Sequence, residues 1–342
     1  MAQTVPSKIG STQQARSPAE TLLSIRNLRT AVSQGEDRFD IVRDLSLDIF
    51  PNEIVCLVGE SGCGKSITAL SVMRLLPTPP VRAIGGEIQF KENDLLTLSD
   101  KEMRKVRAED IAMVFQDPLT SLDPVFSVGS VMTEVIKAHR DLDTNTARTM
   151  ALEALQEVGL PDPEKRLDSY PHQMSGGMRQ RVLIATALVL DPDLLIADEP
   201  TTALDVTVQA QILEMLLEEQ RQRHMSILLI THDLAVVAGV ADRVAVMYAG
   251  EIVEQAPVDE LFEDPKHPYT QGLLHALPHI SVKREKLIPI PGVVPPPQMM
   301  PPGCRFAPRC PYALSRCWQE RPELEINAGR PLRCFNPQPF VA

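Results

Sequence analysis

Residues 59–66 read GESGCGKS, a run in which three glycines precede a lysine and a serine. Backbone amide groups in such a turn can point inward around phosphate oxygens, and the following helix directs its positive end at them. Lys65 can reach the β- and γ-phosphates of a nucleotide, and the hydroxyl of Ser66 can ligate Mg²⁺. The run predicts a phosphate-binding loop made of Gly59, Glu60, Ser61, Gly62, Cys63, Gly64, Lys65 and Ser66.

Two carboxylates end an apolar run, LLIADEP, at residues 194–200. Asp198 is predicted to hold Mg²⁺ directly or through water, and Glu199 to polarise the attacking water. Strands also commonly end in polar residues for structural reasons alone. The phosphate-binding loop upstream favours the catalytic interpretation.

A second anion-binding surface is predicted at MSGGMRQR, residues 174–181. Ser175 is a natural N-cap for the apolar helix that follows, and the amides of Gly176 and Gly177 stay free for an anion. The sequence contains only one phosphate-binding loop with its lysine, so one copy of the chain offers no second nucleotide for this helix end to bind. The economical interpretation is that two such subunits face each other, each supplying this helix end to the other's nucleotide.

Apolar runs outline the elements that must position these residues. The runs at 22–32, 53–59, 193–200 and 226–233 predict strands, and the last three are continuous enough for a parallel sheet covered by helices. Across 206–220, one helical face carries Val208, Ile212, Met215 and Leu216. Helical patterns from about 100 to 175 predict a subdomain inserted into the sheet-bearing core.

Composition excludes several classes of protein. The 342 residues carry a formal charge of −11, which argues against a general nucleic-acid binder. No apolar run reaches the roughly 18 residues that span a bilayer. Residues 1–21 lack the apolar region of a signal peptide and predict a disordered tail. We therefore expect a cytosolic chain that acts at a membrane only as a peripheral subunit.

From about residue 22 onward, the motifs resemble those of ABC transporter ATP-binding subunits. The resemblance implies an α/β fold of the P-loop NTPase type over 22–265, with a RecA-like core, an antiparallel β subdomain and an inserted α-helical subdomain. Gln116 in VFQDP matches a glutamine that senses Mg²⁺ and contacts the transmembrane partner. Asp205 in TTALD matches a residue that crosses the dimer interface, and His232 in LLITHD is similar to the switch histidine that contacts the γ-phosphate.

The histidine and the adenine contact need separate comment. A histidine that ends a strand is more often structural, so the role of His232 depends on the matched order of the motifs. The family usually stacks an aromatic ring on adenine, whereas the aligned position here is Val32. Phe39 is the nearest aromatic residue, and the adenine contact is left open.

Further segments resemble the ATPase subunits of bacterial dipeptide and oligopeptide importers: DPLTSLDP, YPHQMSGG, MYAGEIVEQ and HPYTQGLL. The resemblance implies ATP and Mg²⁺ as cofactors and peptide import at the cytoplasmic face of the bacterial inner membrane. The implied partners are a homologous ATPase subunit, two permease subunits and, indirectly, an extracytoplasmic solute-binding protein.

Two alternatives remain. Relatives with nearly the same motifs carry nickel, glutathione or antimicrobial peptides. A soluble ABC ATPase of DNA repair or translation is an alternative of another class, which the single ATPase unit and the acidic balance disfavour.

Four cysteines, Cys304, Cys310, Cys317 and Cys334, lie in a proline-rich extension over 266–342. Their spacing, C-x₅-C-x₆-C-x₁₆-C, is looser than that of zinc ribbons. A cysteine-bearing segment of roughly 40 residues cannot usually be held together by apolar burial alone and needs a staple. Disulfides are disfavoured as that staple in a reducing cytosol. A [4Fe–4S] cluster, zinc, or unligated thiols packed as small apolar groups could each explain them, and the importer resemblance implies the cluster. We expect this staple to lie well away from ATP, with its charge offset by Arg305, Arg309, Arg316 and Arg333.

Overall fold

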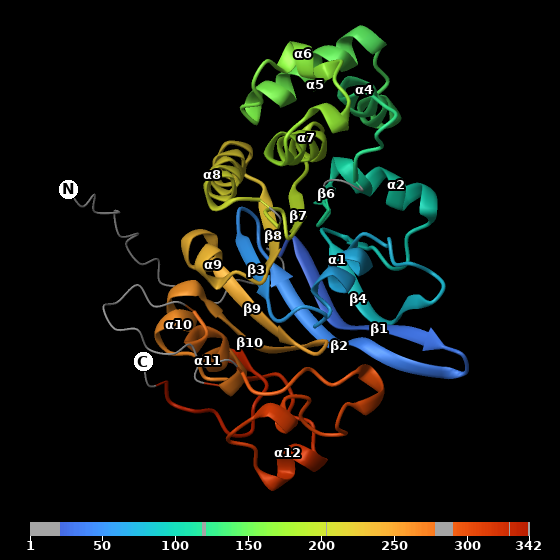
Figure 1. Ribbon diagram of the computed structural model, residues 1–342. Coiled ribbons are helices and arrows are strands. Elements are labelled where there is room, and N and C mark those ends of the chain that lie inside the picture. Colours follow the sequence, from blue (N-terminus) through green and yellow to red (C-terminus); the bar gives the residue numbers. More distant parts are fainter. Residues whose placement is uncertain (1–20, 118–120, 203, 278–289, 328, 341–342) are drawn as a thin grey trace, which may run out of the picture.

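The computed structural model describes residues 21–117, 121–202, 204–277, 290–327 and 329–340 (Figure 1). Residues 1–20 of the predicted disordered tail lie outside the described residues. Residues 278–289 of the proline-rich extension do so as well. Among the residues that the structure describes, no helix combines the length and the apolar character needed to cross a bilayer.

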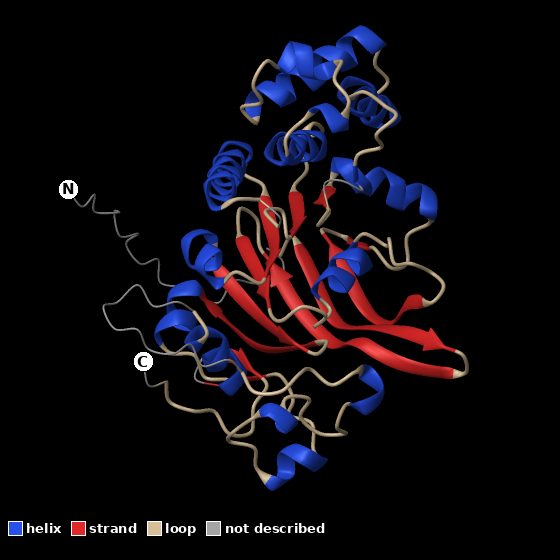
Figure 2. Ribbon diagram, viewed as in Figure 1, coloured by secondary structure: helices blue, strands red, loops and turns tan. Residues whose placement is uncertain are grey.

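A mixed sheet forms the centre of the molecule (Figure 2). Its parallel part contains, in spatial order, β9 (Arg243–Tyr248), β3 (Ile54–Val58), β8 (Ser226–Thr231), β7 (Leu194–Asp198) and β6 (Ile111–Val114). Every residue of β3, β7 and β8 is buried, as their continuous apolar character predicts. The predicted strands 53–59, 193–200 and 226–233 are therefore confirmed.

Side chains alternate between the two faces of this sheet and contribute to two separate cores. Ile54, Cys56 and Val58 pack with the helices on one face. Val55 and Leu57 pack on the other face against a second, antiparallel sheet. That sheet has the order β2 (Asp37–Ile49), β1 (Leu23–Gln34), β4 (Val81–Phe90) and β5 (Asn93–Asp94), with α1 (Lys65–Val72) and α2 (Asp100–Glu109) nearby. It corresponds to the antiparallel subdomain that the resemblance implies.

Helices α4 (Val128–His139), α5 (Thr144–Glu157) and α6 (Pro163–Leu167) form a layer beyond the end of the sheet (Figure 1). The turn η2 (Pro171–Gln173) and α7 (Gly176–Leu188) return from it to β7. The prediction of one helical region from about 100 to 175 is wrong in one respect: it includes β6, which pairs with β7 in the central sheet. A strand of four residues is too short to stand out from the helical patterns on both sides of it.

Helices α8 (Val206–Arg223) and α9 (Leu234–Val240) flank β8 in the chain. The predicted face of α8 is confirmed, since Ile212 and Leu216 are buried and Val208 and Met215 pack against the same core.

The C-terminal extension is joined to the central sheet. Beyond β10 (Glu251–Pro257) come α10 (Val258–Glu263), α11 (Pro268–His275), the turns η3 (Pro297–Met299) and η4 (Ala307–Arg309), and α12 (Ser315–Gln319). The last strands, β11 (Glu325–Asn327) and β12 (Arg330–Leu332), continue the sheet next to β10. The extension therefore adds strands to the central sheet.

Buried charge strengthens this attachment. The Glu254 carboxylate is fully buried and accepts hydrogen bonds from the backbone N–H groups of Lys266 at 2.8 Å and His267 at 3.0 Å. Arg330 of β12 donates to it as well, at 3.3 Å. Loss of these partners would leave a buried, unpaired carboxylate and strongly destabilise the fold. The three hydrogen bonds therefore hold the start of the extension and β12 to β10.

Candidate nucleotide-binding and hydrolysis site

The predicted phosphate-binding loop runs from the end of β3 to the first residue of α1. Its glycines Gly59, Gly62 and Gly64 have φ angles of 153°, 78° and 107°, which other residues rarely adopt. A Cβ atom on Gly59 would lie 2.1 Å from the carbonyl oxygen of Met247 in β9. The loop can therefore press against the neighbouring strand only because this residue is glycine.

Lys65 is buried at the base of the loop, where its ammonium group donates to two carbonyl oxygens. Nζ lies 2.8 Å from the oxygen of Gly59 and 3.2 Å from that of Glu60. These contacts hold the positive charge at the start of α1, where phosphate oxygens would meet the helix N-terminus. Cys63 is also buried, which raises the pKa of its thiol. The thiol therefore stays uncharged and fills space.

Asp198 and Ser66 supply oxygen ligands suited to Mg²⁺. Asp198 is the last residue of β7, and its carboxylate is hydrogen-bonded to the Ser66 hydroxyl. Burial raises the pKa of Asp198, although the bond from Ser66 lowers it in part. Its Oδ1 atom is buried and has no hydrogen-bond partner among the described residues. A buried carboxylate oxygen left in this way, next to a hydroxyl, fits a hard divalent cation.

Glu199 lies at the centre of a cluster formed by the ends of three parallel strands. Oε1 of Glu199 is 3.2 Å from Nδ1 of His232, which follows β8. Oε2 accepts hydrogen bonds at 2.9 Å from the Gln116 amide, beyond β6, and at 2.9 Å from the Thr202 hydroxyl. The structure thus brings Gln116, Glu199 and His232 together. Thr202 was missed by the sequence analysis, although it belongs to the same TTALD segment as Asp205.

The hydrogen bonds around Glu199 set its charge state. Burial raises the pKa of Glu199, but the hydrogen bonds from Thr202 and His232 outweigh burial and bring that pKa below the usual range. The group is therefore a carboxylate at neutral pH and can accept a hydrogen bond from a water molecule. The side-chain amide nitrogen of Gln116 donates its hydrogen bond to Glu199. The predicted role of Gln116 in sensing Mg²⁺ stays a prediction.

The predicted second anion-binding surface lies at the start of α7. The Ser175 hydroxyl accepts a hydrogen bond from the Met178 N–H group at 3.3 Å, which confirms that Ser175 is the N-cap. A Cβ atom on Gly177 would lie 2.7 Å from Val208 of α8, and one on Gly176 would lie 3.4 Å from Leu204. The two glycines therefore allow this helix end to pack closely on the segment that contains Asp205.

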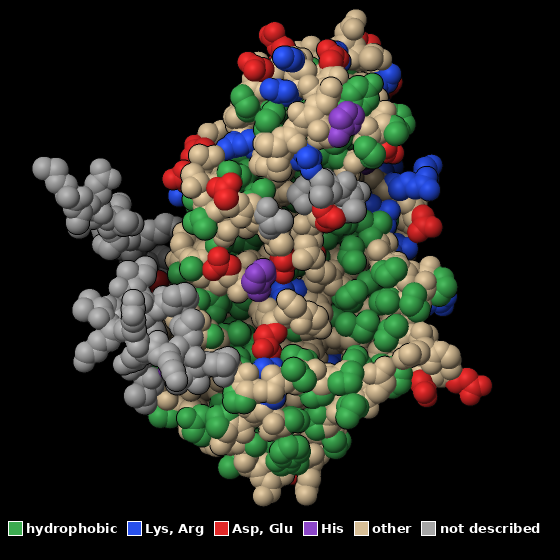
Figure 3. Space-filling view, viewed as in Figure 1, with side chains coloured by type: hydrophobic (Ala, Val, Ile, Leu, Met, Phe, Trp, Pro, Cys, Tyr) green, Lys and Arg blue, Asp and Glu red, His purple; other side chains and the backbone are tan. Residues whose placement is uncertain are grey.

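Asp205 itself caps α8. Its carboxylate accepts hydrogen bonds from the N–H groups of Thr207 at 3.1 Å and Val208 at 3.0 Å. The next side chain, Val206, is 84% exposed, so this corner of the molecule is open to a partner. Acidic, basic and histidine side chains gather in the middle of the face shown in Figure 3, between the helical layer and the extension.

Comparisons with known proteins agree with this geometry. The ABC transporter family matches residues 42–202, and the C-terminal region of oligopeptide/dipeptide transporters matches residues 253–317. The dipeptide transport ATP-binding protein DppD of Bacillus subtilis is 51% identical over 273 residues, which cover 80% of this chain and 82% of that protein. The chain belongs to the ATP-binding proteins of ABC transporters.

Other relatives of this ABC transporter ATP-binding protein extend over nearly the whole chain. DppD of Escherichia coli is 47% identical over 317 residues, which cover 92% of this chain and 97% of the relative. Among solved structures, a dimeric ATP-binding cassette in a post-hydrolysis state with bound ADP and Pi is 27% identical. It covers 69% of this chain and 98% of its own, with a TM-score of 0.62. The fold is that of an ATP-hydrolysing cassette of the P-loop NTPase type.

The extension of this ABC protein touches the phosphate-binding loop directly. Arg309 forms an ion pair with Glu60 at 2.6 Å, and Tyr269 of α11 accepts a hydrogen bond from the Glu60 N–H group at 2.9 Å. The expectation that the extension lies well away from ATP is therefore wrong. Charges and hydroxyls far apart in the sequence have many alternative partners, so their pairing is not visible before the chain is folded.

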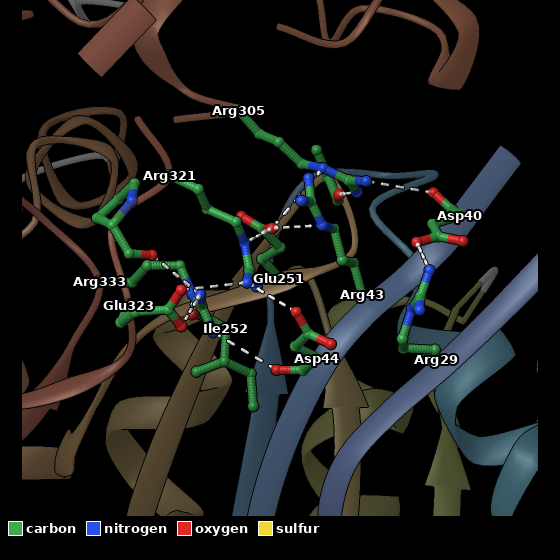
Figure 4. A network of polar contacts seen from close by, with 12 residues as sticks. Arg29, Asp40, Arg43, Asp44, Glu251, Ile252, Arg305, Arg321, Glu323 and Arg333 are labelled. Carbon is green, nitrogen blue, oxygen red and sulfur yellow. Dashed lines mark hydrogen bonds and ion pairs between the residues drawn. The ribbon is translucent and has the colours of Figure 1, made fainter. Parts of the chain in front are cut away.

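The arginines of the extension are also used differently from the prediction. Arg305 donates to the Ala249 carbonyl, and Arg333 donates to the Ile252 carbonyl at 3.0 Å. Together with Arg321, they surround the start of β10 near the buried Glu251 (Figure 4). Arg316 stays within the extension, 3.6 Å from the Phe335 ring centroid. Three of the four arginines predicted to offset a metal cluster therefore attach the extension to the ATPase core.

The residues considered for the adenine contact are neighbours. Val32 of β1 pairs with Phe39 of β2 across the antiparallel sheet, and directly opposite residues lie on the same face. Both side chains are half-buried.

We expect Glu199→Gln to lower ATP turnover at least about a hundredfold while ATP binding is retained, because only the water-activating carboxylate is lost. Phosphate release measures turnover, and titration with ATP and Mg²⁺ measures binding. Glu218→Gln, an exposed change on α8, is the matched control. Near-normal phosphate release by Glu199→Gln would exclude this carboxylate as the catalytic base.

Lys65→Ala should weaken ATP binding about tenfold to a hundredfold, because it removes a charge-assisted bond to the β- and γ-phosphates. The same titration measures the effect, with Lys101→Ala on the exposed side of α2 as the control. Unchanged affinity in Lys65→Ala would contradict the assignment of the loop.

Proposed function

We propose that this chain is the ATPase subunit of an importer that takes up dipeptides or oligopeptides across the bacterial inner membrane. The observation that carries the proposal is that one chain combines the Glu199 cluster with a C-terminal region of the peptide-transporter type. ATP binding closes two ATPase subunits on two nucleotides, and hydrolysis reopens them. This cycle drives the permeases between inward-facing and outward-facing states.

The partner ATPase subunit is a homologous chain. In the closed pair, the N-terminus of α7, with Ser175, Gly176 and Gly177, faces the γ-phosphate held by the other subunit. Asp205 crosses the interface beside it. The exposure of Val206 supports an interface at this corner, and the ADP-bound cassette with the same fold is a dimer.

Two permease subunits complete the transporter. Three large apolar side chains, Phe115, Val125 and Phe126, are 39%, 70% and 49% exposed on either side of Gln116. Apolar surface left in water on the segment that follows β6 supports docking of a permease segment there. Through such contacts the subunit works as a peripheral protein at the cytoplasmic face. An extracytoplasmic solute-binding protein delivers the cargo without contacting this chain.

Uptake of a labelled dipeptide tests the proposal. Deleting the gene for this chain from the bacterium should abolish uptake of the dipeptide. The wild-type gene should restore uptake, whereas a gene with Glu199→Gln should not. Loss of nickel or glutathione uptake with normal peptide uptake would keep the transporter and change its cargo. Recovery of the purified chain with ribosomes or DNA, and not with membranes, would favour the soluble alternative and contradict transport.

We further propose that the extension holds a [4Fe–4S] cluster. Cys304, Cys310, Cys317 and Cys334 all line one small, mainly apolar cavity, and none of these thiols is in a disulfide. A hydrogen bond of 2.8 Å from the Cys304 N–H group to the Cys317 carbonyl joins two of these residues. No three or more His, Cys, Asp or Glu residues among those described are grouped as ligands of a metal ion.

The loose spacing of the four cysteines in the sequence favours a cluster over a zinc ribbon. In a [4Fe–4S] cluster each thiolate binds a different iron, so the four sulfurs surround a larger volume than the ligands of one tetrahedral ion. Burial raises the pKa of Cys304 to about 11 and that of Cys334 to about 12, so without a metal these thiols stay protonated at neutral pH. When bound, the cluster would link η4, which Cys304 and Cys310 flank, to Cys317 of α12 and to Cys334 after β12.

Purification without oxygen tests the cluster. We expect brown protein with about four irons and four sulfides per chain, whose colour fades in air. Replacing any one of the four cysteines with serine should remove the colour and make the extension more sensitive to protease. Cys56→Ser, in β3, is the matched control. Colourless protein with one zinc per chain, or with no metal and an equally resistant extension, would contradict the cluster.

A further inference from the structure

The second residue of the phosphate-binding loop is held by the C-terminal extension at three atoms. Arg309 donates from Nη1 to Glu60 Oε2 at 2.6 Å and from Nη2 to Oε1 at 3.0 Å, a two-pronged pair. The Tyr269 hydroxyl accepts from the Glu60 N–H group at 2.9 Å. Both the side chain and the backbone of Glu60 are therefore bound by residues more than 200 positions away.

The side chain of Arg309 is itself fixed by contacts with the extension and with β9. Its side chain is only 4% exposed, and Nε donates to the Pro291 carbonyl at 2.9 Å. The guanidinium also lies over the ring of Tyr248, at the end of β9, 5.7 Å from its centroid. Since both contacts already fix the arginine, it can restrain Glu60 with little further loss of side-chain entropy.

Tyr269 belongs to the HPYT segment, whose role the nucleotide site does not otherwise explain. His267 is buried, and its Nδ1 accepts a hydrogen bond from the Tyr269 N–H group at 3.0 Å, which caps α11. The fully buried Tyr269 ring packs edge-on against Tyr248, at 4.7 Å between centroids. The segment thus delivers a fixed hydroxyl to the loop.

Restraint of Glu60 reaches the phosphate-binding lysine through the backbone. Lys65 Nζ donates to the carbonyl oxygens of Gly59 and Glu60, at 2.8 and 3.2 Å. The Gly59–Glu60 peptide unit therefore contacts Lys65 through its carbonyl group and Tyr269 through its N–H group, while Arg309 holds the side chain of Glu60. A loop already fixed in this way loses less conformational entropy when it orders around a ligand.

Charge gives Arg309 a second effect. Glu60 places a carboxylate, 31% exposed, in the loop that must receive a polyphosphate. The negative charges of this carboxylate and of the phosphates repel each other, which would oppose nucleotide binding. The ion pair with Arg309 neutralises that carboxylate in place.

We propose that Arg309 is a positioning residue of the nucleotide site, which holds the phosphate-binding loop in its receptive form and cancels the charge of Glu60. Arg309 acts through Glu60 and does not touch the nucleotide. The inference rests on the proposed ATP site but on neither the cargo nor the cluster.

Titration of the full chain with ATP and Mg²⁺, together with steady-state hydrolysis, tests the proposal. Arg309→Gln should weaken ATP binding and raise KM about tenfold, with kcat at saturating ATP changed less than about twofold. Arg309→Lys, which keeps the charge but not the two-pronged geometry, should recover part of the affinity.

Arg321→Gln is the matched control. Arg321 is another largely buried arginine of the extension, paired with Glu251 and Asp44 at 2.7 Å each, and no contact of the phosphate-binding loop involves it. If Arg309 only attached the extension to the core, Arg321→Gln would weaken ATP binding equally. That result, or wild-type affinity in Arg309→Gln, would overturn the proposal.

A second variant separates positioning from folding. In Glu60→Gln the repelling charge is gone, so adding Arg309→Gln should cost less than about threefold in affinity. A full tenfold loss in the double variant would mean that Arg309 acts independently of Glu60. Failure of the wild-type chain to bind ATP would instead contradict the proposed function, so the two hypotheses fail in distinguishable ways.

Discussion

The nucleotide site depends on the common direction of the parallel strands in the central sheet. Strands β3, β6, β7 and β8 run the same way, so their carboxyl ends meet at one edge. This single constraint brings the phosphate-binding loop, Gln116, the Asp198–Glu199 pair and His232 within reach of one another, although they come from four separate parts of the chain. Complete burial of β3, β7 and β8 fixes the strands and hence the distances between the side chains that follow them.

Three carboxylates, those of Asp198, Glu199 and Glu60, lie in a site that must bind a negatively charged polyphosphate. Each of them is accommodated by different contacts. Asp198 keeps one oxygen free of protein partners, where a divalent cation would bring the needed positive charge. Glu199 is stabilised as a carboxylate by Thr202, Gln116 and His232. Glu60 is paired with Arg309. Lys65 offers the ligand a positive charge that no carboxylate neutralises, since its oxygen contacts are with the carbonyl groups of Gly59 and Glu60.

Features that depend on residues close together in the sequence were predictable. The loop, its strand and Asp198–Glu199 follow from fixed spacings next to apolar runs, and Ser175 was recognised as a cap because capping is local. Features that depend on distant pairs were not. Strand β12 joins β10 through a single pair of residues, Glu254 and Leu332. The short strand β6 has too little pattern of its own. Arg309 could have paired with any exposed acid, so its partner became visible only in the folded structure.

The position of Arg309 in the chain has a consequence for how the protein is made. Glu60 precedes its partner by 249 residues, and every motif that identifies the ATPase precedes Arg309 as well. A ribosome therefore completes the phosphate-binding loop, the carboxylates and His232 long before the arginine emerges. During synthesis the nascent ATPase core carries an unneutralised Glu60, and a product shortened at any point after residue 232 keeps every motif of the nucleotide site. Whether such a product still includes residue 309 decides if its nucleotide loop is complete, so a late stop codon can be far more damaging than a motif search would suggest.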